Sequence, residues 1–148
     1  GFNYRLTDIQ CGLGLSQLMK LRRFIRRRQA IAARYFEGLA DLPHITLPTV
    51  REGIESGWHL FTIRVPEARY RRPLFHALRA LGLGVQVHYL PVYLHPYYAT
   101  LGYTPGLCPI AEDIYERNIT IPLFPRMSDD MVERVMERVR EAVEDILP

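Results

Sequence analysis

The sequence predicts an α+β fold in which helices cover one side of a small, mostly antiparallel sheet, preceded by a long amphipathic helix. Two observations carry this prediction. Apolar residues recur at helical spacing over long stretches near both ends of the 148-residue chain. Between them, the alternating and β-branched runs are short and few. With 48% hydrophobic residues, the chain can bury one core but is too short for two, so we expect a single compact unit.

The first helical region starts at Thr7, which forms a capping-box pattern with Gln10. The helical pattern continues to Gly38 with one break near Ser16, which gives a short helix and a long one. A helical projection of residues 18–39 predicts a core-facing arc, made of Leu18, Leu21, Phe24, Ile25, Ile31, Ala32, Tyr35, Phe36 and Leu39. Most arginines fall on the opposite arc. Arg28 alone projects into the apolar arc, where it needs an acidic partner, an interface or a path to solvent.

The remaining elements are shorter. Alternation and β-branched residues predict strands at residues 44–47, 58–65, 85–89 and 119–122. Helices are predicted at residues 72–81, ending at Gly82 and Gly84, and at 108–118, with an aromatic loop and one helical turn between residues 91 and 106. Ser128 is predicted to cap a last helix, whose core positions are Val132, Val135, Val139, Val143 and Ile146.

Composition narrows the class of protein. The net charge of +3 is modest and does not by itself imply nucleic acid, although the basic residues 20–28 leave a nucleic-acid-binding module as an alternative. The sequence has neither a long apolar window nor a secretory pattern at its start. Cys11 and Cys108 lie far apart without metal-ligand spacing, so we expect buried free thiols and a cytoplasmic location.

Two groups of residues are candidates for binding. Asn3 and Arg5 precede the first capped helix, although residues of these types at such a place are more often ordinary solvated side chains. His88 and Tyr89 end a predicted strand and are followed by Pro91, an arrangement that presents an imidazole and a phenol to a cleft. A partly buried histidine with a satisfied hydrogen bond remains the alternative for His88. His95 has no nearby acidic or thiol ligand, so no metal site is expected.

Four segments, in order, resemble the C-terminal part of the DegT/DnrJ/EryC1/StrS aminotransferases. They are GFNYRLTDIQCGLGLSQL, WHLFTIRV, GLGVQVHYLPVYLHPYY and CPIAEDIYERNITIPLFPRMSDDMV. The resemblance covers essentially the whole chain. It implies that residues 1–148 are the small C-terminal domain of a fold-type I homodimer, in which residues 1 to about 40 connect to a large upstream domain.

The resemblance also implies a reaction. Pyridoxal 5'-phosphate would carry an amino group from a donor such as glutamate to C4 of a nucleotide-linked 4-keto-6-deoxysugar. Asn3, supported by Tyr4 and Arg5, would reach the cofactor phosphate and substrate region of the other subunit. The sugar pocket would be lined by Gln86, His88, Tyr89, Leu90 and Pro91.

The chain itself is expected to hold no catalytic residue. Its only lysine, Lys20, starts a basic helix face, where an amine stays protonated and cannot form the Schiff base. By itself the chain should therefore be inactive. A dimerisation module is the remaining alternative to the enzyme interpretation, and the sequence suggests no membrane partner.

Overall fold

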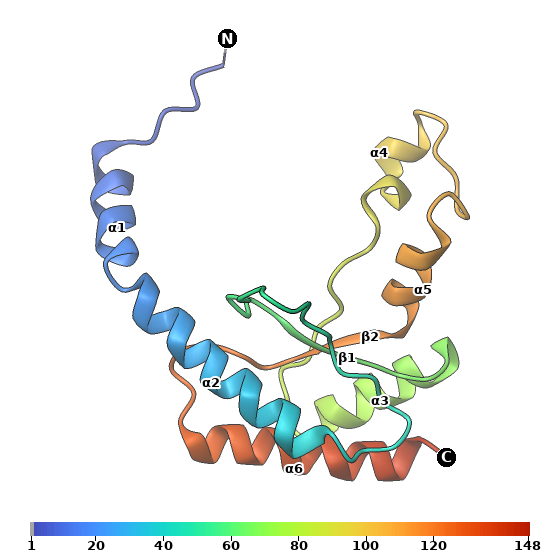
Figure 1. The fold of residues 1–148 in the computed structure, drawn as a ribbon. Coiled ribbons are helices and arrows are strands. Elements are labelled where there is room, and N and C mark those ends of the chain that lie inside the picture. The colour runs from blue at the N-terminus through green and yellow to red at the C-terminus, as the bar shows by residue number, and fades with distance from the viewer. Residues whose placement is uncertain (1) are drawn as a thin grey trace.

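A computed structural model describes residues 2–148 and confirms the α+β fold. The elements, in chain order, are α1 (Asp8–Leu18), α2 (Leu21–Leu39), β1 (Phe61–Arg64), α3 (Ala68–Ala80), a 3-10 turn (Val92–Leu94), α4 (Pro96–Ala99), α5 (Pro109–Arg117), β2 (Asn118–Ile121) and α6 (Asp129–Ile146). In Figure 1, α2, α3 and α6 form a layer and the sheet lies on it. Within residues 2–148, no helix is long and apolar enough to span a membrane.

The sheet is antiparallel and smaller than predicted. Phe61 of β1 lies opposite Ile121 of β2, and Arg64 lies opposite Asn118. Two further segments join this pair by single bridges, residue 46 beside β1 and residue 86 beside β2. The predicted strands 44–47, 58–65 and 85–89 were therefore too long. Left-handed backbone at His44 (φ 68°) and Trp58 (φ 44°) interrupts two of them.

The two faces of the sheet differ in polarity. Side chains alternate along each strand, so one face carries the fully buried Phe61, Ile63, Ile119 and Ile121. This face packs against the helices, for example through the ring of Tyr35 in α2, 5.1 Å from the ring of Phe61. The opposite face carries Thr62, Arg64, Asn118 and Thr120. It is turned away from the helices.

The predicted helix caps are present. Thr7 and Gln10 form the capping box of α1, and the hydroxyl of Ser128 accepts a hydrogen bond from Met131 N (3.2 Å) at the start of α6. All four core valines predicted for α6 are buried, namely Val132, Val135, Val139 and Val143. The break between the first two helices falls at Met19 and Lys20 rather than near Ser16.

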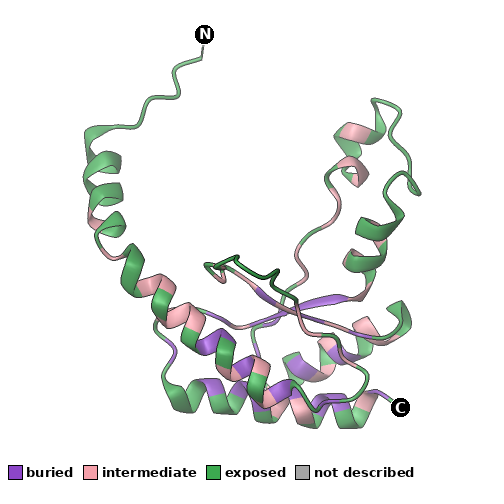
Figure 2. Cartoon of the chain, viewed as in Figure 1, coloured by how far each residue is buried: buried purple, intermediate pink, exposed green. Residues whose placement is uncertain are grey.

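The predicted core arc of α2 is correct only in its second half. Ile31, Ala32, Tyr35 and Leu39 are buried, whereas Leu18 is 64% exposed and Leu21 is 44% exposed. Figure 2 shows why, because α1 and the start of α2 extend beyond the helix layer and have nothing from this chain to pack on. The two cysteines are free, as predicted, but they are exposed rather than buried.

Arg28 has no acidic partner within residues 2–148 and is held instead by main-chain oxygens. Its Nη1 lies 3.0 Å from the carbonyl oxygen of Trp58, 3.1 Å from that of His59 and 3.3 Å from that of Leu123. The side chain is thus held by main-chain carbonyls that precede β1 and follow β2. It fastens α2 to the adjacent ends of both strands.

Two arms rise from the helix layer on either side of the sheet (Figure 1). The segment before α1, together with α1, forms the first arm, and the segment from residue 92 through α5 forms the second. Both arms are largely exposed in Figure 2, and neither α1 nor α5 contains a buried residue. The polar face of the sheet lies between the bases of these arms.

Candidate functional site at the polar sheet face

Two polar side chains of β2 are almost completely buried. Asn118 and Thr120 are each 6% exposed and lie on the polar face, two residues apart. The Nδ2 of Asn118 donates to the carbonyl oxygen of His88 (3.1 Å), and the Oγ1 of Thr120 lies 3.0 Å from Nδ1 of His88. Burying these polar groups is favourable only because each has a partner. Both partners belong to His88, so β2 fixes this residue at its main chain and at its ring.

His88 therefore combines both interpretations made from the sequence. It is half-buried and has a satisfied nitrogen, yet it also ends the segment that enters the polar face. Within residues 2–148, its Nε2 has no hydrogen-bond partner. An imidazole held through Nδ1 in this way can offer Nε2 to a hydroxyl or keto oxygen without losing its orientation.

The segment that carries His88 is aligned by main-chain bonds. Gln86 N donates to the carbonyl oxygen of Thr120 (3.1 Å), and Thr120 N donates back to Gln86 O (2.8 Å). The pairing of this segment with β2 ends at Gln86, because the carbonyl oxygen of His88 accepts from the Asn118 side chain instead of from the main chain of β2. This contact explains why the strand predicted at residues 85–89 reduces to one bridge.

The structure brings the other predicted residues of this segment together with His88. Tyr89 is 67% exposed, its ring centre is 4.4 Å from that of His88, and the peptide bond between the two residues is cis. Leu90 and Pro91 are half-buried, and Pro91 O accepts from Leu94 N (2.9 Å) to start the 3-10 turn. The cluster thus presents one fixed imidazole and one exposed phenol, and a 3-10 turn follows it directly.

A hydrogen-bonded cluster closes the loop that follows. The hydroxyl of Tyr93 donates to the carboxylate of Glu112 in α5, which also accepts from Gly106 N (2.7 Å). Cys108 N donates to the hydroxyl of Tyr93 (3.2 Å). These donors, Tyr93 first, hold the pKa of Glu112 below its usual value. The second arm is therefore tied to the chain directly after the candidate site.

Asn3 and Arg5 lie elsewhere. Both are exposed, in the extended segment before α1. Figure 1 shows this segment on the arm opposite the one that residues 92–117 build. Within a single chain, the structure does not bring Asn3 and Arg5 next to His88.

The basic face of α2 is partly neutralised by α6. Arg27 Nη2 lies 2.8 Å from Asp129 Oδ1, Arg34 Nη1 lies 3.1 Å from the same oxygen, and Arg34 also pairs with Glu133. The hydrogen bond from Arg27 holds the pKa of Asp129 below its usual value. Two arginines of the predicted solvent face thus help to pack two helices together, which weakens the interpretation of this face as a nucleic-acid surface.

Sequence reasoning identified His88 but missed the residues that hold it. The signal was present in the segment Asn118-Ile119-Thr120-Ile121, where polar and β-branched apolar residues alternate. A polar residue at every second position of a short interior strand indicates a polar sheet face. The missing information was that this face receives a histidine from a neighbouring segment.

Comparison with known proteins identifies the protein family. Residues 1–140 match the model of the DegT/DnrJ/EryC1/StrS aminotransferase family, and the chain belongs to this family. It is 36% identical over 148 residues to the spore coat polysaccharide biosynthesis protein SpsC of Bacillus subtilis, covering 97% of this chain and 38% of SpsC.

Solved structures agree in fold. Helicobacter pylori PseC, an aminotransferase involved in the biosynthesis of pseudoaminic acid, is 30% identical with a TM-score of 0.88, covering 98% of this chain and 39% of PseC. Spr1654 of Streptococcus pneumoniae is assigned as a sugar aminotransferase and was solved in its PLP form. It is 32% identical with a TM-score of 0.88, covering 97% of this chain and 37% of Spr1654. The family and its PLP-form relative indicate pyridoxal phosphate as cofactor. This chain spans less than two fifths of the length of each relative.

The residues of this chain do not fit covalent attachment of that cofactor. The only lysine, Lys20, precedes α2 and borders a hollow with three arginines, Arg23, Arg27 and Arg126. It does not belong to the polar sheet face. These 148 residues therefore offer polar and aromatic contacts at that face, but not the amine that would hold the cofactor there.

Proposed function

We propose that this chain is the C-terminal small domain of a pyridoxal-phosphate-dependent aminotransferase that acts on a nucleotide-linked 4-keto-6-deoxysugar at C4. The amino donor in this proposal is glutamate. Within the family, the segment QVHYLPVYLHPYY favours enzymes that make UDP-4-amino-4,6-dideoxy-N-acetyl-β-L-altrosamine. The role of SpsC in spore coat polysaccharide biosynthesis is in keeping with such a sugar product.

The observation that carries the proposal is the way β2 holds His88. A sugar substrate presents hydroxyl and keto oxygens, which an oriented imidazole can bind through Nε2. The contacts from Thr120 and Asn118 set that orientation before substrate arrives. Tyr89, Leu90 and Pro91 would line the same pocket, with Gln86 at its edge. The chain's contribution is to position the substrate.

Asn3 and Arg5 have a second role in the proposal. Their arm lies apart from His88 in one chain, so they would serve the cofactor phosphate and the substrate in a second subunit of a homodimer. Residues 1 to about 40 would connect this domain to the part of the enzyme that holds the cofactor. Residues 1–148 by themselves should show no turnover with pyridoxal phosphate, glutamate and a ketosugar nucleotide, a result that an activity assay checks.

The role of His88 can be tested in the complete enzyme by separating the two half-reactions. The first half-reaction uses glutamate and no sugar, and the second uses the ketosugar nucleotide. His88→Asn keeps a polar atom near Thr120 but shortens the side chain. Loss of one hydrogen bond to substrate should lower kcat/KM for the sugar by roughly 10- to 100-fold, while the glutamate half-reaction stays unchanged.

Two further variants complete the design. His88→Gln places an amide near the position of Nε2 and should recover part of the lost kcat/KM. His76→Asn, at an exposed histidine of α3, is the matched control and should behave like wild type. An equal loss in both half-reactions of His88→Asn would show that His88 has no specific role toward the sugar.

A further inference from the structure

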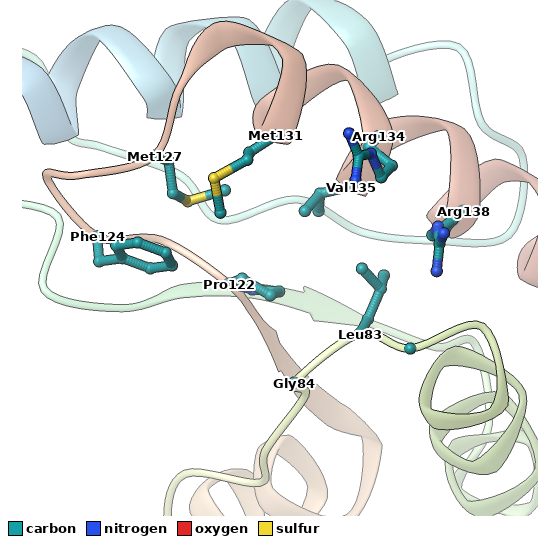
Figure 3. Close-up of a pocket in the computed structure, with 10 residues that line it drawn as sticks. Leu83, Gly84, Pro122, Phe124, Met127, Met131, Arg134, Val135 and Arg138 are labelled. Atoms are coloured by element: carbon teal, nitrogen blue, oxygen red, sulfur yellow. The ribbon is translucent and has the colours of Figure 1, made fainter.

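A hollow lined by apolar side chains and two arginines lies between α6 and the C-terminal end of β2. Its volume is about 520 Å³, and α6 bounds it on one side (Figure 3). The turn at residues 82–84 and the segment after β2 bound it on the other. By strand register, His88 lies beside the start of β2, whereas this hollow lies beyond its end. A volume of this size is typical of sites for small molecules.

The floor of the hollow is apolar and adaptable. Figure 3 shows the side chains of Leu83, Pro122, Phe124, Met127, Met131 and Val135 directed toward a common space. Phe124 and Met131 are 40% and 39% exposed, which is high for large apolar side chains in a concave position. Thioether side chains adjust their shape readily and pack well on aromatic rings. The floor therefore suits a flat or branched apolar group.

Two arginines stand at one edge of this floor. Arg134 and Arg138 are one turn apart on α6 and both line the hollow (Figure 3). In the described part of the chain, neither forms an ion pair, whereas Arg140 of the same helix pairs with Asp41. Two neighbouring guanidinium groups without carboxylates repel each other, and an anion between them removes that repulsion.

The two glycines of the turn differ in their relation to the hollow. Gly82 has a φ of +80°, and a Cβ on it would stand 3.1 Å from Nη1 of Arg138, so glycine lets this guanidinium lie over the turn. A Cβ on Gly84 would meet no atom within 4 Å. By strand alternation this open space lies on the side of Gln86 and Thr120, at the polar face, and not in the hollow.

We propose that this hollow binds a small amphipathic anion, with its phosphate or carboxylate group on Arg134 and Arg138 and its apolar body on the methionine-lined floor. The volume limits the ligand to a small molecule, and the placement of both cations at one edge requires an anionic group at one end. The two features together select an aryl or alkyl phosphate or carboxylate.

The test uses the complete protein with methyl-labelled methionine and 1-naphthyl phosphate as the probe. The NMR signals of Met127 and Met131 should shift on titration, while that of the exposed Met19, on the first arm, should not. Neutral 1-naphthol, which has the same ring system, should bind at least about tenfold more weakly. The double variant Arg134→Gln and Arg138→Gln should weaken naphthyl phosphate to the same degree.

A filling variant gives an independent check. Met131→Trp enlarges a half-exposed side chain that is directed into the hollow and should abolish the shift of Met127. Met19→Trp is the matched control, since Met19 is exposed on the first arm and does not line this hollow. Three results would each overturn the proposal. They are equal affinity for the neutral and anionic probes, an unchanged shift of Met127 in Met131→Trp, and absence of methyl shifts because another part of the protein covers the hollow.

Discussion

Replacing Arg28 with alanine should destabilise the attachment of α2 to the sheet by about 2–3 kcal/mol. One nitrogen, Nη1, lies within 3.3 Å of the carbonyl oxygens of Trp58, His59 and Leu123. This nitrogen carries two hydrogens, so two of the three contacts count as full hydrogen bonds. At about 1.5–3 kcal/mol for each bond from a charged donor, the gross contribution is about 3–6 kcal/mol.

Two effects reduce this gross value. Trp58 has a φ of 44°, a left-handed conformation that costs a bulky residue on the order of 1–2 kcal/mol and that can relax when its carbonyl is released. His59 is exposed, so water can replace Arg28 at its carbonyl oxygen. Subtracting about 1–3 kcal/mol for both effects leaves a net loss of about 0–5 kcal/mol, and its central value of about 2–3 kcal/mol is the expected result.

Hydrogen exchange measures this loss locally in the complete protein. A loss of 2–3 kcal/mol corresponds to roughly 30- to 150-fold faster exchange of the amides in β1 and β2, where opening limits exchange. Arg28→Lys keeps a charge with three donors and should recover about half of the free energy. Arg26→Ala, at an exposed position of the same helix, is the control. Equal exchange in Arg28→Ala and Arg26→Ala would refute the assigned role.

Three further predictions follow from contacts of named side chains. The buried hydroxyl of Tyr35 donates to Pro122 O (2.6 Å), so Tyr35→Phe should lower the free energy of unfolding by about 1–2 kcal/mol in denaturant titrations. Burial raises the pKa of Tyr35, so wild type should also lose stability as pH rises above the usual tyrosine pKa, a loss that Tyr35→Phe lacks. The pKa of Glu112 is lowered, so its contribution to the stability of the loop at residues 100–107 should be complete above the usual glutamate pKa and lost as pH falls through the lowered value. Limited proteolysis of residues 100–107 as a function of pH can follow this loss. In Glu112→Gln that pH dependence should vanish. On β2, Ile119→Val should cost about 1 kcal/mol of stability and leave kcat/KM for the sugar unchanged. Thr120→Val should instead lower kcat/KM by a larger free energy than it removes from stability. Paired kinetics and unfolding measurements would show this difference.

The fold was predictable where local interactions decide it. Thr7 with Gln10, and Ser128, mark helix starts through contacts within one turn, so the sequence shows them directly. The valines of α6 are buried because their spacing leaves only one apolar face. The first half of α2 has the same apolar spacing but remains exposed, since spacing specifies which side of a helix is apolar and not whether a partner covers it.

Long-range contacts account for the parts that were not predicted. The strand expected at residues 85–89 reduces to one bridge because the side chain of Asn118 takes the carbonyl of His88. The partners of Arg28 are main-chain carbonyls, which every sequence contains and which no residue pattern marks. The same holds at the site, where His88 was selected from its place at a strand end but Thr120 and Asn118 were not, since their role depends on which segment lies beside β2.

The exposed arms bear directly on the strength of the proposed hydrogen bond between His88 and a sugar. Ile9 and Leu13 on the first arm are 87% and 63% exposed, and Tyr97 and Ile110 on the second are 68% and 77% exposed. Burying four such side chains contributes on the order of 6–12 kcal/mol, which gives both arms a strong tendency to associate with other protein surface. In the proposed enzyme, the cofactor domain and a second subunit supply that surface. Covering arms that flank the polar face also removes water from it, and a hydrogen bond from His88 strengthens as the surroundings become less polar. In the proposed enzyme, the same association that hides the apolar arms would therefore make the proposed contact of His88 with a sugar stronger than this domain could achieve alone.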